Sequence, residues 1–251
     1  MERVVEAARE ARGEVGEDAA VPDLLALVEQ VHGVPVAVLA LDAGVAGAYL
    51  RRPRGALILL NGTEAAARLR FTLAHELGHH VLRHGQSVDT PASLAAPARP
   101  VEVEANRFAA ELLLPQAAVR AWLDARPPVA LGLGDVVELA AGFGVSALVA
   151  LFRLQGAGAL SDRDRAARIR TEIEDGAHLD LRHRLGLRDL DDGVARARAA
   201  MPRLPGAAAG SVLDAYARGE LPAERLAVVV RAGVDEARAT LRAAALAPPG
   251  G

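Results

Sequence analysis

The segment FTLAHELGHHVLRH, residues 71–84, contains four of the chain's seven histidines and a glutamate directly after the first of them. His75 and His79 are four residues apart, and on a helix this spacing places both imidazoles on one face, where they can bind a single ion. Glu76 lies one position round the helix and can take a proton from water at that ion. The HExxH pattern therefore predicts a helix that carries a metal-dependent hydrolytic centre.

The helix around this motif is predicted to span residues 61–85, with Asn61 or Thr63 at its start and Gly85 at its end. The small residue Gly78 keeps the motif face open to close packing by another element. The other histidines show no convincing ligand pattern. We expect His80 and His84 to lie either on the surface or behind the ligand histidines. His32, His178 and His183 are expected to have ordinary roles.

A third ligand is expected from the segment VEVEANRFAAELLLP, which predicts a second helix ending at Pro115. Glu104 shares a helical face with Phe108 and Leu112, so it is predicted to turn inward and to complete a site with the two histidines. Glu102 and Glu111 are the alternative acids.

The metal expected at this site is zinc, because histidine and carboxylate ligands with one open position favour that ion. Manganese or iron can bind the same set of ligands. Asn106 is either an ordinary surface residue or a residue that orients one of the ligand histidines.

Three β-rich runs precede the motif, at residues 34–41, 47–52 and 55–61. They predict a small antiparallel sheet packed on the helix pair, and therefore the α+β class. An edge of this sheet near residues 55–61 is expected to hold an extended substrate. Residues 86–100 contain three prolines and are predicted to be a loop that shapes or covers the cleft.

The composition excludes several classes of function. The net charge is −3 and the basic residues are scattered, so we expect no nucleic-acid-binding surface. The chain contains no cysteine, which excludes disulfides and thiolate zinc sites. The N-terminal residues lack the apolar core of a signal peptide and no apolar run predicts a membrane span, so we expect a cytoplasmic protein. The oligomeric state stays open.

Residues 21–125 resemble the ImmA/IrrE family of zinc metallopeptidases. The resemblance lies in the order of three elements: an apolar strand, the HExxH helix and the helix with the sequence EVEANRFAAELLLP. The resemblance implies a gluzincin-like fold with His75, His79 and Glu104 as zinc ligands and Glu76 as general base. It also implies that the substrate is a helix-turn-helix transcriptional repressor, whose cleavage relieves repression in stress responses or phage control. The alternative is a non-catalytic, zinc-containing transcriptional regulator or partner-binding protein.

The remaining segments extend this organisation. Residues 1–20 are predicted to form an N-terminal helix or lead, residues 21–128 the metallopeptidase domain, and residues 129–160 a segment similar to the helix-turn-helix that follows it in the family. The second helix of that segment offers only Ser146 and Arg153 for contacts with bases, so we expect packing or partner docking rather than direct DNA binding. Residues 161–251 are predicted to be helical with a flexible tail, and no sensor domain is expected there.

Overall fold

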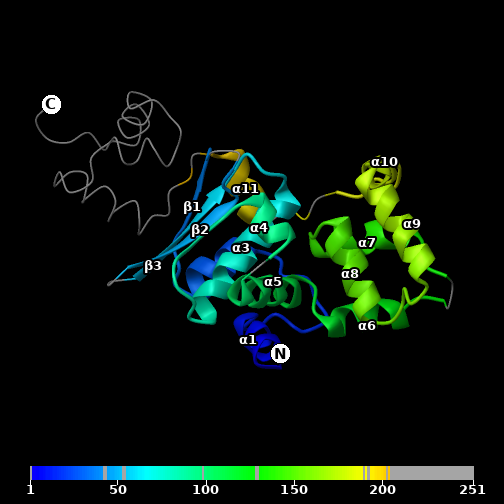
Figure 1. Ribbon diagram of the computed structural model, residues 1–251, viewed down its shortest axis with the longest axis horizontal. Coiled ribbons are helices and arrows are strands. Elements are labelled where there is room, and N and C mark those ends of the chain that lie inside the picture. The colour runs from blue at the N-terminus through cyan, green and yellow to red at the C-terminus, as the bar shows by residue number, and fades with distance from the viewer. Residues whose placement is uncertain are drawn as a thin grey trace, which may run out of the picture.

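In the computed structural model of the chain, the described residues are 2–41, 44–52, 55–97, 99–127, 130–188, 190, 193–201 and 203. They form one four-stranded sheet and a series of helices, which confirms the α+β class. Figure 1 shows the sheet with α1, α3, α4, α5 and α11 in one part of the molecule and α6 to α10 in a second part beside it. The part of the predicted helical region 161–251 that follows residue 203, with its predicted tail, lies outside the described residues.

The strands agree closely with the three β-rich runs, and a fourth, short strand follows the motif helix. Their bounds are β1 Val36–Leu39, β2 Gly47–Arg52, β3 Gly55–Asn61 and β4 Ser87–Asp89.

The helices of the sheet-containing part are α1 Glu2–Ala11, α2 Leu24–Ala26, which continues into the π-helical turn η1 Leu27–Val31, α3 Ala66–Val81, α4 Pro91–Ala95, α5 Pro100–Leu113 and α11 Gly193–Ala199. Those of the second part are α6 Gln116–Asp124, α7 Leu133–Phe143, α8 Ala147–Gly156, α9 Arg163–Glu174 and α10 Ala177–Arg184.

The sheet is mixed, and not antiparallel throughout as the sequence suggested. Its order is β1-β3-β2-β4, with β1 and β3 parallel and the other pairs antiparallel. The β2–β3 hairpin inserts β3 next to β1, so that Val38 pairs with Leu60. The prediction of an edge at residues 55–61 is therefore wrong, because β3 is hydrogen-bonded on both sides. The edges are β1, which forms a local bridge with Arg203, and β4.

The motif helix α3 is shorter than predicted at both ends. Asn61 does not cap it, because its side-chain oxygen accepts hydrogen bonds from the Leu41 and Thr63 backbone N–H groups at 3.1 and 3.2 Å within the loop before the helix. At the other end, Arg83 adopts a left-handed conformation with φ of 60°. This reversal brings His84 back over the last turn of the helix, where its N–H donates to the His79 carbonyl at 2.9 Å.

Helices α3 and α5 pack closely, as the small residues predicted. A Cβ atom on Gly78 would lie 3.0 Å from Phe108 Cδ1 and 3.3 Å from Ala105 Cα, so the two backbones approach each other at this point. Phe108 and Ala105 are fully buried. This contact sets the position of α5 relative to the histidines of α3.

The N-terminal helix α1 is part of the same core and packs on α5. Its buried side chains are Val4, Ala8 and Ala11. Directly after it, the buried guanidinium of Arg12 donates hydrogen bonds to the carbonyls of Leu112, in α5, and of Gly16 and Ala19. The predicted lead is thus joined to the metal-motif helices by burial and by hydrogen bonds.

Helices α7 and α8 form the expected helix-turn-helix-like pair. The chain bends by 106° between them, and Gly144 at the turn has φ of 62°, a left-handed conformation that glycine adopts easily. Ala140 and Ala150 are buried, as expected for residues at the contact between two helices. Arg70 of α3 donates from Nε to the Gly144 carbonyl at 3.2 Å, which connects this pair to the motif helix.

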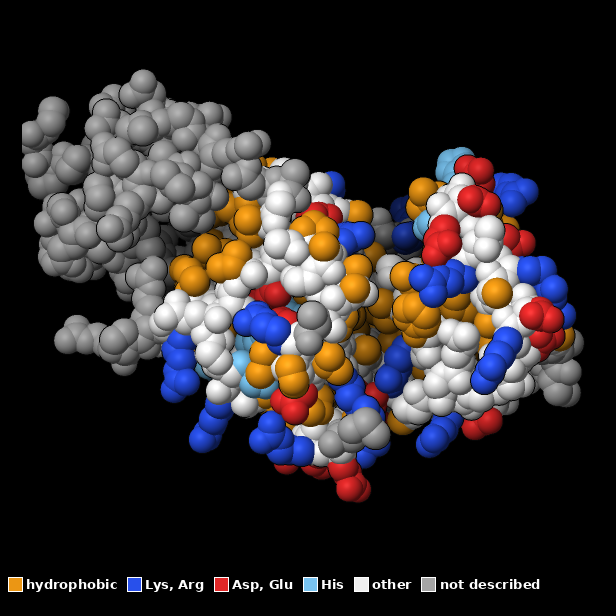
Figure 2. Space-filling model, viewed as in Figure 1, with side chains coloured by type: hydrophobic (Ala, Val, Ile, Leu, Met, Phe, Trp, Pro, Cys, Tyr) orange, Lys and Arg blue, Asp and Glu red, His pale blue; other side chains and the backbone are white. Residues whose placement is uncertain are grey.

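Within the described residues, no single helix is long and apolar enough to cross a membrane; α7 and α8 reach that length and composition only together, as a bent pair. On the face shown in Figure 2, arginine side chains are spread among acidic and apolar ones rather than gathered into one basic surface.

Candidate metal centre

The two motif histidines meet as their spacing predicted. His75 and His79 are fully buried, and their Nε2 atoms lie 3.0 Å apart on the same face of α3. Two imidazole nitrogens at this distance can share a proton or bind one ion.

The acid that reaches the histidines is Glu102 and not Glu104. The Oε2 atom of Glu102 lies 3.2 Å from Nε2 of His75 and 3.2 Å from Nε2 of His79, and the residue is 2% exposed. The Glu104 side chain is 40% exposed and pairs instead with His84 at 3.1 Å and with Arg3 at 3.6 Å.

The expectation that Glu104 turns toward the histidines therefore does not describe this structure. The reason is helix geometry: at 100° per residue, positions 102 and 104 lie on opposite flanks of the apolar stripe of α5. Both flanks are equally plausible from the sequence, and only the packing of Ala105 against Gly78 turns the Glu102 flank to the site. The third acid, Glu111, is buried and forms an ion pair with Arg153 of α8.

Asn106 lies on the Glu102 flank and holds His75 in place. Its Oδ1 accepts a hydrogen bond from His75 Nδ1 at 2.8 Å, while its amide nitrogen donates to the Leu94 carbonyl at 2.8 Å. With Nδ1 as the donor, the Nε2 lone pair of neutral His75 points into the cluster, as metal binding requires. Of the two roles considered for Asn106, the structure supports the orienting one.

The general-base candidate Glu76 is fully buried beside the histidines. Its Oε2 accepts a hydrogen bond from the Ser87 hydroxyl at 3.2 Å, and its Oε1 has no hydrogen-bond partner among the described residues. A Cβ atom on Gly47 of β2 would lie 2.9 Å from this Oε1, so a glycine at that position leaves room for the carboxylate.

Asp89 is the residue that sequence reasoning missed, because residues 86–100 were predicted to be a loop. Strand β4 and helix α4 occupy that segment, and β4 directs Asp89 inward. Its Oδ2 lies 3.5 Å from His75 Nε2 and 3.9 Å from His79 Nε2. No spacing rule connects position 89 to the motif; the alternation Ser87-Val88-Asp89, with two polar residues on one face of a short strand, is the only local signal.

Of the other two histidines of the segment, His84 lies behind His79, whereas His80 is half-buried and contacts Tyr49. His84 Nδ1 is 3.1 Å from His79 Nδ1, and His84 Nε2 is 3.1 Å from Glu104 Oε2. His80 Nδ1 is 3.1 Å from the Tyr49 hydroxyl. Among the described residues, Glu104 is therefore linked to the cluster through His84, which contacts His79.

Four ligand atoms, one each from His75, His79, Asp89 and Glu102, lie within 4.8 Å of one another, and all four residues are buried. Donor atoms about 2.0–2.2 Å from a tetrahedral zinc ion are roughly 3.3 Å apart. The separations given above run from 3.0 to 3.9 Å. Glu76 Oε1 and Asp89 Oδ2 have no hydrogen-bond partner among the described residues, and with these oxygens the arrangement fits a divalent cation.

Residues 29–155 match the family model described as Peptidase_M78, the IrrE N-terminal-like domain. The chain belongs to this peptidase family. The match confirms the resemblance seen in the sequence and extends over the metal cluster and the α7–α8 pair. No curated protein matches the chain significantly.

The charges of this IrrE-like centre are strongly coupled. Burial opposes charge on His75, but the neighbouring carboxylates of Asp89 and Glu102 outweigh that effect and raise the pKa of His75 to about 9. Burial and the neighbouring His75 lower the pKa of His79 to about 4. Burial raises the pKa of Glu76 well above its usual range. In the metal-free cluster His75 is therefore a charged imidazolium and His79 a neutral imidazole at neutral pH.

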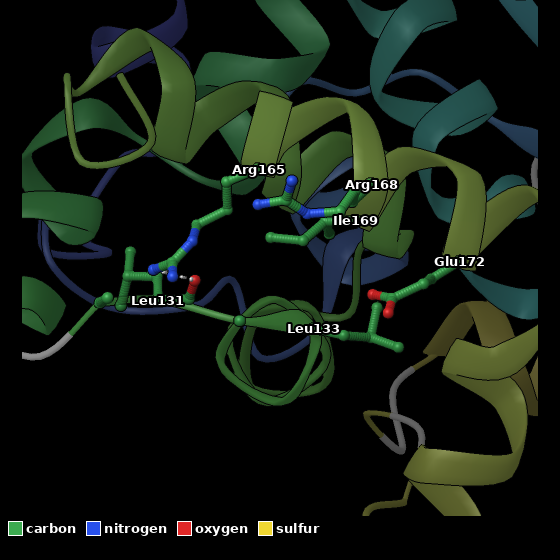
Figure 3. Close-up of a pocket in the computed structure, with 8 residues that line it drawn as sticks. Leu131, Leu133, Arg165, Arg168, Ile169 and Glu172 are labelled. Atoms are coloured by element: carbon green, nitrogen blue, oxygen red, sulfur yellow. Dashed lines mark hydrogen bonds between the residues drawn. The ribbon is translucent and has the colours of Figure 1, made fainter. Parts of the chain in front are cut away.

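A pocket of about 300 Å³ lies elsewhere in this IrrE-like protein, between the start of α7 and α9 (Figure 3). Arg165 and Arg168 line it, and Arg165 donates to the Leu131 carbonyl at 3.4 Å. None of the four metal-cluster residues lines this pocket. The pocket is therefore separate from the candidate metal centre.

Proposed function

We propose that the chain is a zinc-dependent endopeptidase in which His75, His79 and Glu102 hold the metal and Glu76 is the general base. The observation that carries this proposal is the convergence of both histidines and Glu102 at 3.0 to 3.2 Å beside the buried Glu76 carboxylate. Membership of the IrrE-like peptidase family supports the reaction class. Manganese or iron would bind the same donors.

A bound zinc ion supplies Lewis acidity, which polarises a peptide carbonyl and lowers the pKa of water. The residues of the chain do the rest. Glu76 takes a proton from the attacking water as the new carbon–oxygen bond forms, and burial makes its carboxylate a stronger base than an exposed glutamate. The same carboxyl then delivers that proton to the leaving nitrogen as the carbon–nitrogen bond breaks. The Ser87 hydroxyl holds Oε2 and leaves Oε1 for the transfer.

The substrate we propose is a repressor-type protein, cut in an extended segment. Edge strand β4 supports this, because it pairs only with β2 in the sheet and carries Ser87 and Asp89 at the site. An extended peptide can add to such an edge through backbone hydrogen bonds. This replaces the edge expected at residues 55–61. We further propose that this cleavage takes place in the cytoplasm and relieves transcriptional repression, including in stress responses.

A second function has one specific observation in its favour. A structural zinc site has four protein ligands and no open position, and Asp89 adds a fourth candidate ligand to the three proposed above. The chain would then be a non-catalytic regulator that binds a partner protein through its helices.

The test is Glu76→Gln, with wild type and Glu76→Gln each co-expressed with a candidate repressor encoded next to the gene. We expect both proteins to bind zinc in elemental analysis and only wild type to cleave the repressor. Incubation with a cell extract, followed by mass spectrometry of new N-termini, extends the search to other substrates. Equal cleavage by both proteins would exclude Glu76 as the base, and zinc binding without any cleavage would favour the regulator.

A further inference from the structure

We propose that Asp89 is a fourth ligand that closes the metal centre, so that the carboxylate must leave the metal before a substrate can be hydrolysed. This inference rests on the proposed zinc site formed by His75, His79 and Glu102. The added ligand comes from β4, which is outside the motif helices. In this proposal the centre is closed when the Asp89 carboxylate binds the metal and open when that carboxylate moves away.

The first support is geometric. Asp89 Oδ2 lies 3.5 Å from His75 Nε2 and 3.9 Å from His79 Nε2. These distances are close to the roughly 3.3 Å that separates the donor atoms of a tetrahedral zinc site. A carboxylate that only neutralised the charge of the histidines would not need to lie at ligand-like distances from both nitrogens.

The second support is an unsatisfied polar atom. Asp89 is 1% exposed, and its Oδ1 accepts a hydrogen bond from the Ser93 hydroxyl at 3.1 Å. Its Oδ2 is buried and has no hydrogen-bond partner among the described residues; it faces the His75 imidazole only at the longer, ion-pair distance of 3.5 Å. Buried carboxylate oxygens without a partner are costly, and a cation among the four residues would satisfy this one.

The third support is the way β4 presents its side chains. Ser87 and Asp89 lie two residues apart on the buried face, while Val88 between them is 62% exposed. One short strand therefore holds the Glu76 carboxylate through Ser87 and places Asp89 at the histidines. An edge strand of three residues has few bonds to break, so a peptide that adds to it can shift both contacts together.

With four protein ligands, no coordination position is left for water, and withdrawal of Asp89 opens one. The same donor set thus accounts for a closed centre and for a hydrolytic one. The two candidate functions differ only in whether Asp89 can leave.

The experiment uses the full-length protein and three variants: Asp89→Ala, Asp89→Asn, which keeps an acceptor for Ser93, and Asp124→Asn as the charge-matched control at an exposed position of α6. Zinc affinity is measured by competition with a chromophoric chelator, and the Co²⁺-loaded proteins are examined by visible absorption with and without azide. Circular dichroism identifies any variant that fails to fold.

We expect both Asp89 variants to bind zinc at least about 10-fold more weakly than wild type, and the control to match wild type. The Co²⁺ spectrum of wild type should be intense and insensitive to azide, whereas that of Asp89→Ala should weaken and shift when azide is added. Equal affinities and spectra in wild type and Asp89→Ala would overturn this inference alone. Absence of any zinc binding by wild type would overturn the proposed function as well.

Discussion

The choice between Glu102 and Glu104 gives the sharpest test of the metal centre, because the two acids lie two residues apart on one helix and differ in what they contact. The substitutions are Glu102→Gln and Glu104→Gln, which remove one negative charge each and keep the side-chain size. A glutamine at position 102 can still accept the hydrogen bond from Arg99, so the local structure should persist.

The expected magnitudes follow from the contacts. Glu102 Oε2 lies 3.2 Å from both histidine nitrogens, so it is a direct ligand in the proposed site. Loss of a residue that only orients a ligand costs about 10- to 100-fold in metal affinity. Loss of the ligand itself should cost more than about 100-fold, or about 2.7 kcal/mol.

Glu104 contributes much less to metal binding. Its carboxylate is 40% exposed and reaches the cluster only through His84. Because water reaches the Glu104 carboxylate, we take its pair with His84 as worth about 0–1 kcal/mol, which corresponds to at most about fivefold in affinity.

Elemental analysis and chelator competition on both purified variants measure these effects, and circular dichroism confirms that both are folded. Glu102→Gln should lose zinc during purification, and Glu104→Gln should retain it. If Glu104→Gln loses zinc while Glu102→Gln keeps it, the side-chain placement on α5 is wrong and the interpretation of the whole cluster fails with it.

Two further outcomes are expected. Asn106→Ala removes the acceptor that holds His75 Nδ1 and should lower zinc affinity by about 10- to 100-fold; affinity equal to wild type would show that His75 needs no such partner. The pKa of His75 is raised to about 9 and that of His79 is lowered to about 4, so at neutral pH the metal-free His75 is an imidazolium with one extra proton and His79 is a neutral imidazole. Zinc must displace that proton, so affinity should rise with pH up to about 9, with about one proton released per ion. Calorimetry in two buffers of different ionisation enthalpy measures the release, and a value near zero would contradict this charge assignment.

Much of the fold and the site could be predicted from the sequence because these features depend on residues close together in the chain. The four-residue spacing of His75 and His79 places both side chains on one side of any helix, whatever surrounds it. Glu76 is covalently next to His75 and must lie near the same ion. Gly144, at the end of α7, needs a left-handed conformation that glycine adopts easily. Short β-rich runs bounded by glycine and proline likewise predict β1, β2 and β3 without reference to the rest of the chain.

The remaining features depend on how distant segments meet. Both flanks of the apolar stripe on α5 carry an acid, so periodicity alone cannot tell which one faces α3. The packing of Ala105 against Gly78 decides in favour of Glu102. Strand β4 is too short to show a pattern, and it forms because β2 offers it a partner; only that pairing brings Asp89 to the histidines. The position of β3 inside the sheet is likewise a matter of strand order.

The sequence by itself thus determined the motif helix, the two histidines proposed as ligands, the glutamate proposed as base beside them and the family. The tertiary structure decided which carboxylates join them, because an acid from another helix or strand reaches the site only through packing and strand pairing between residues far apart in the chain.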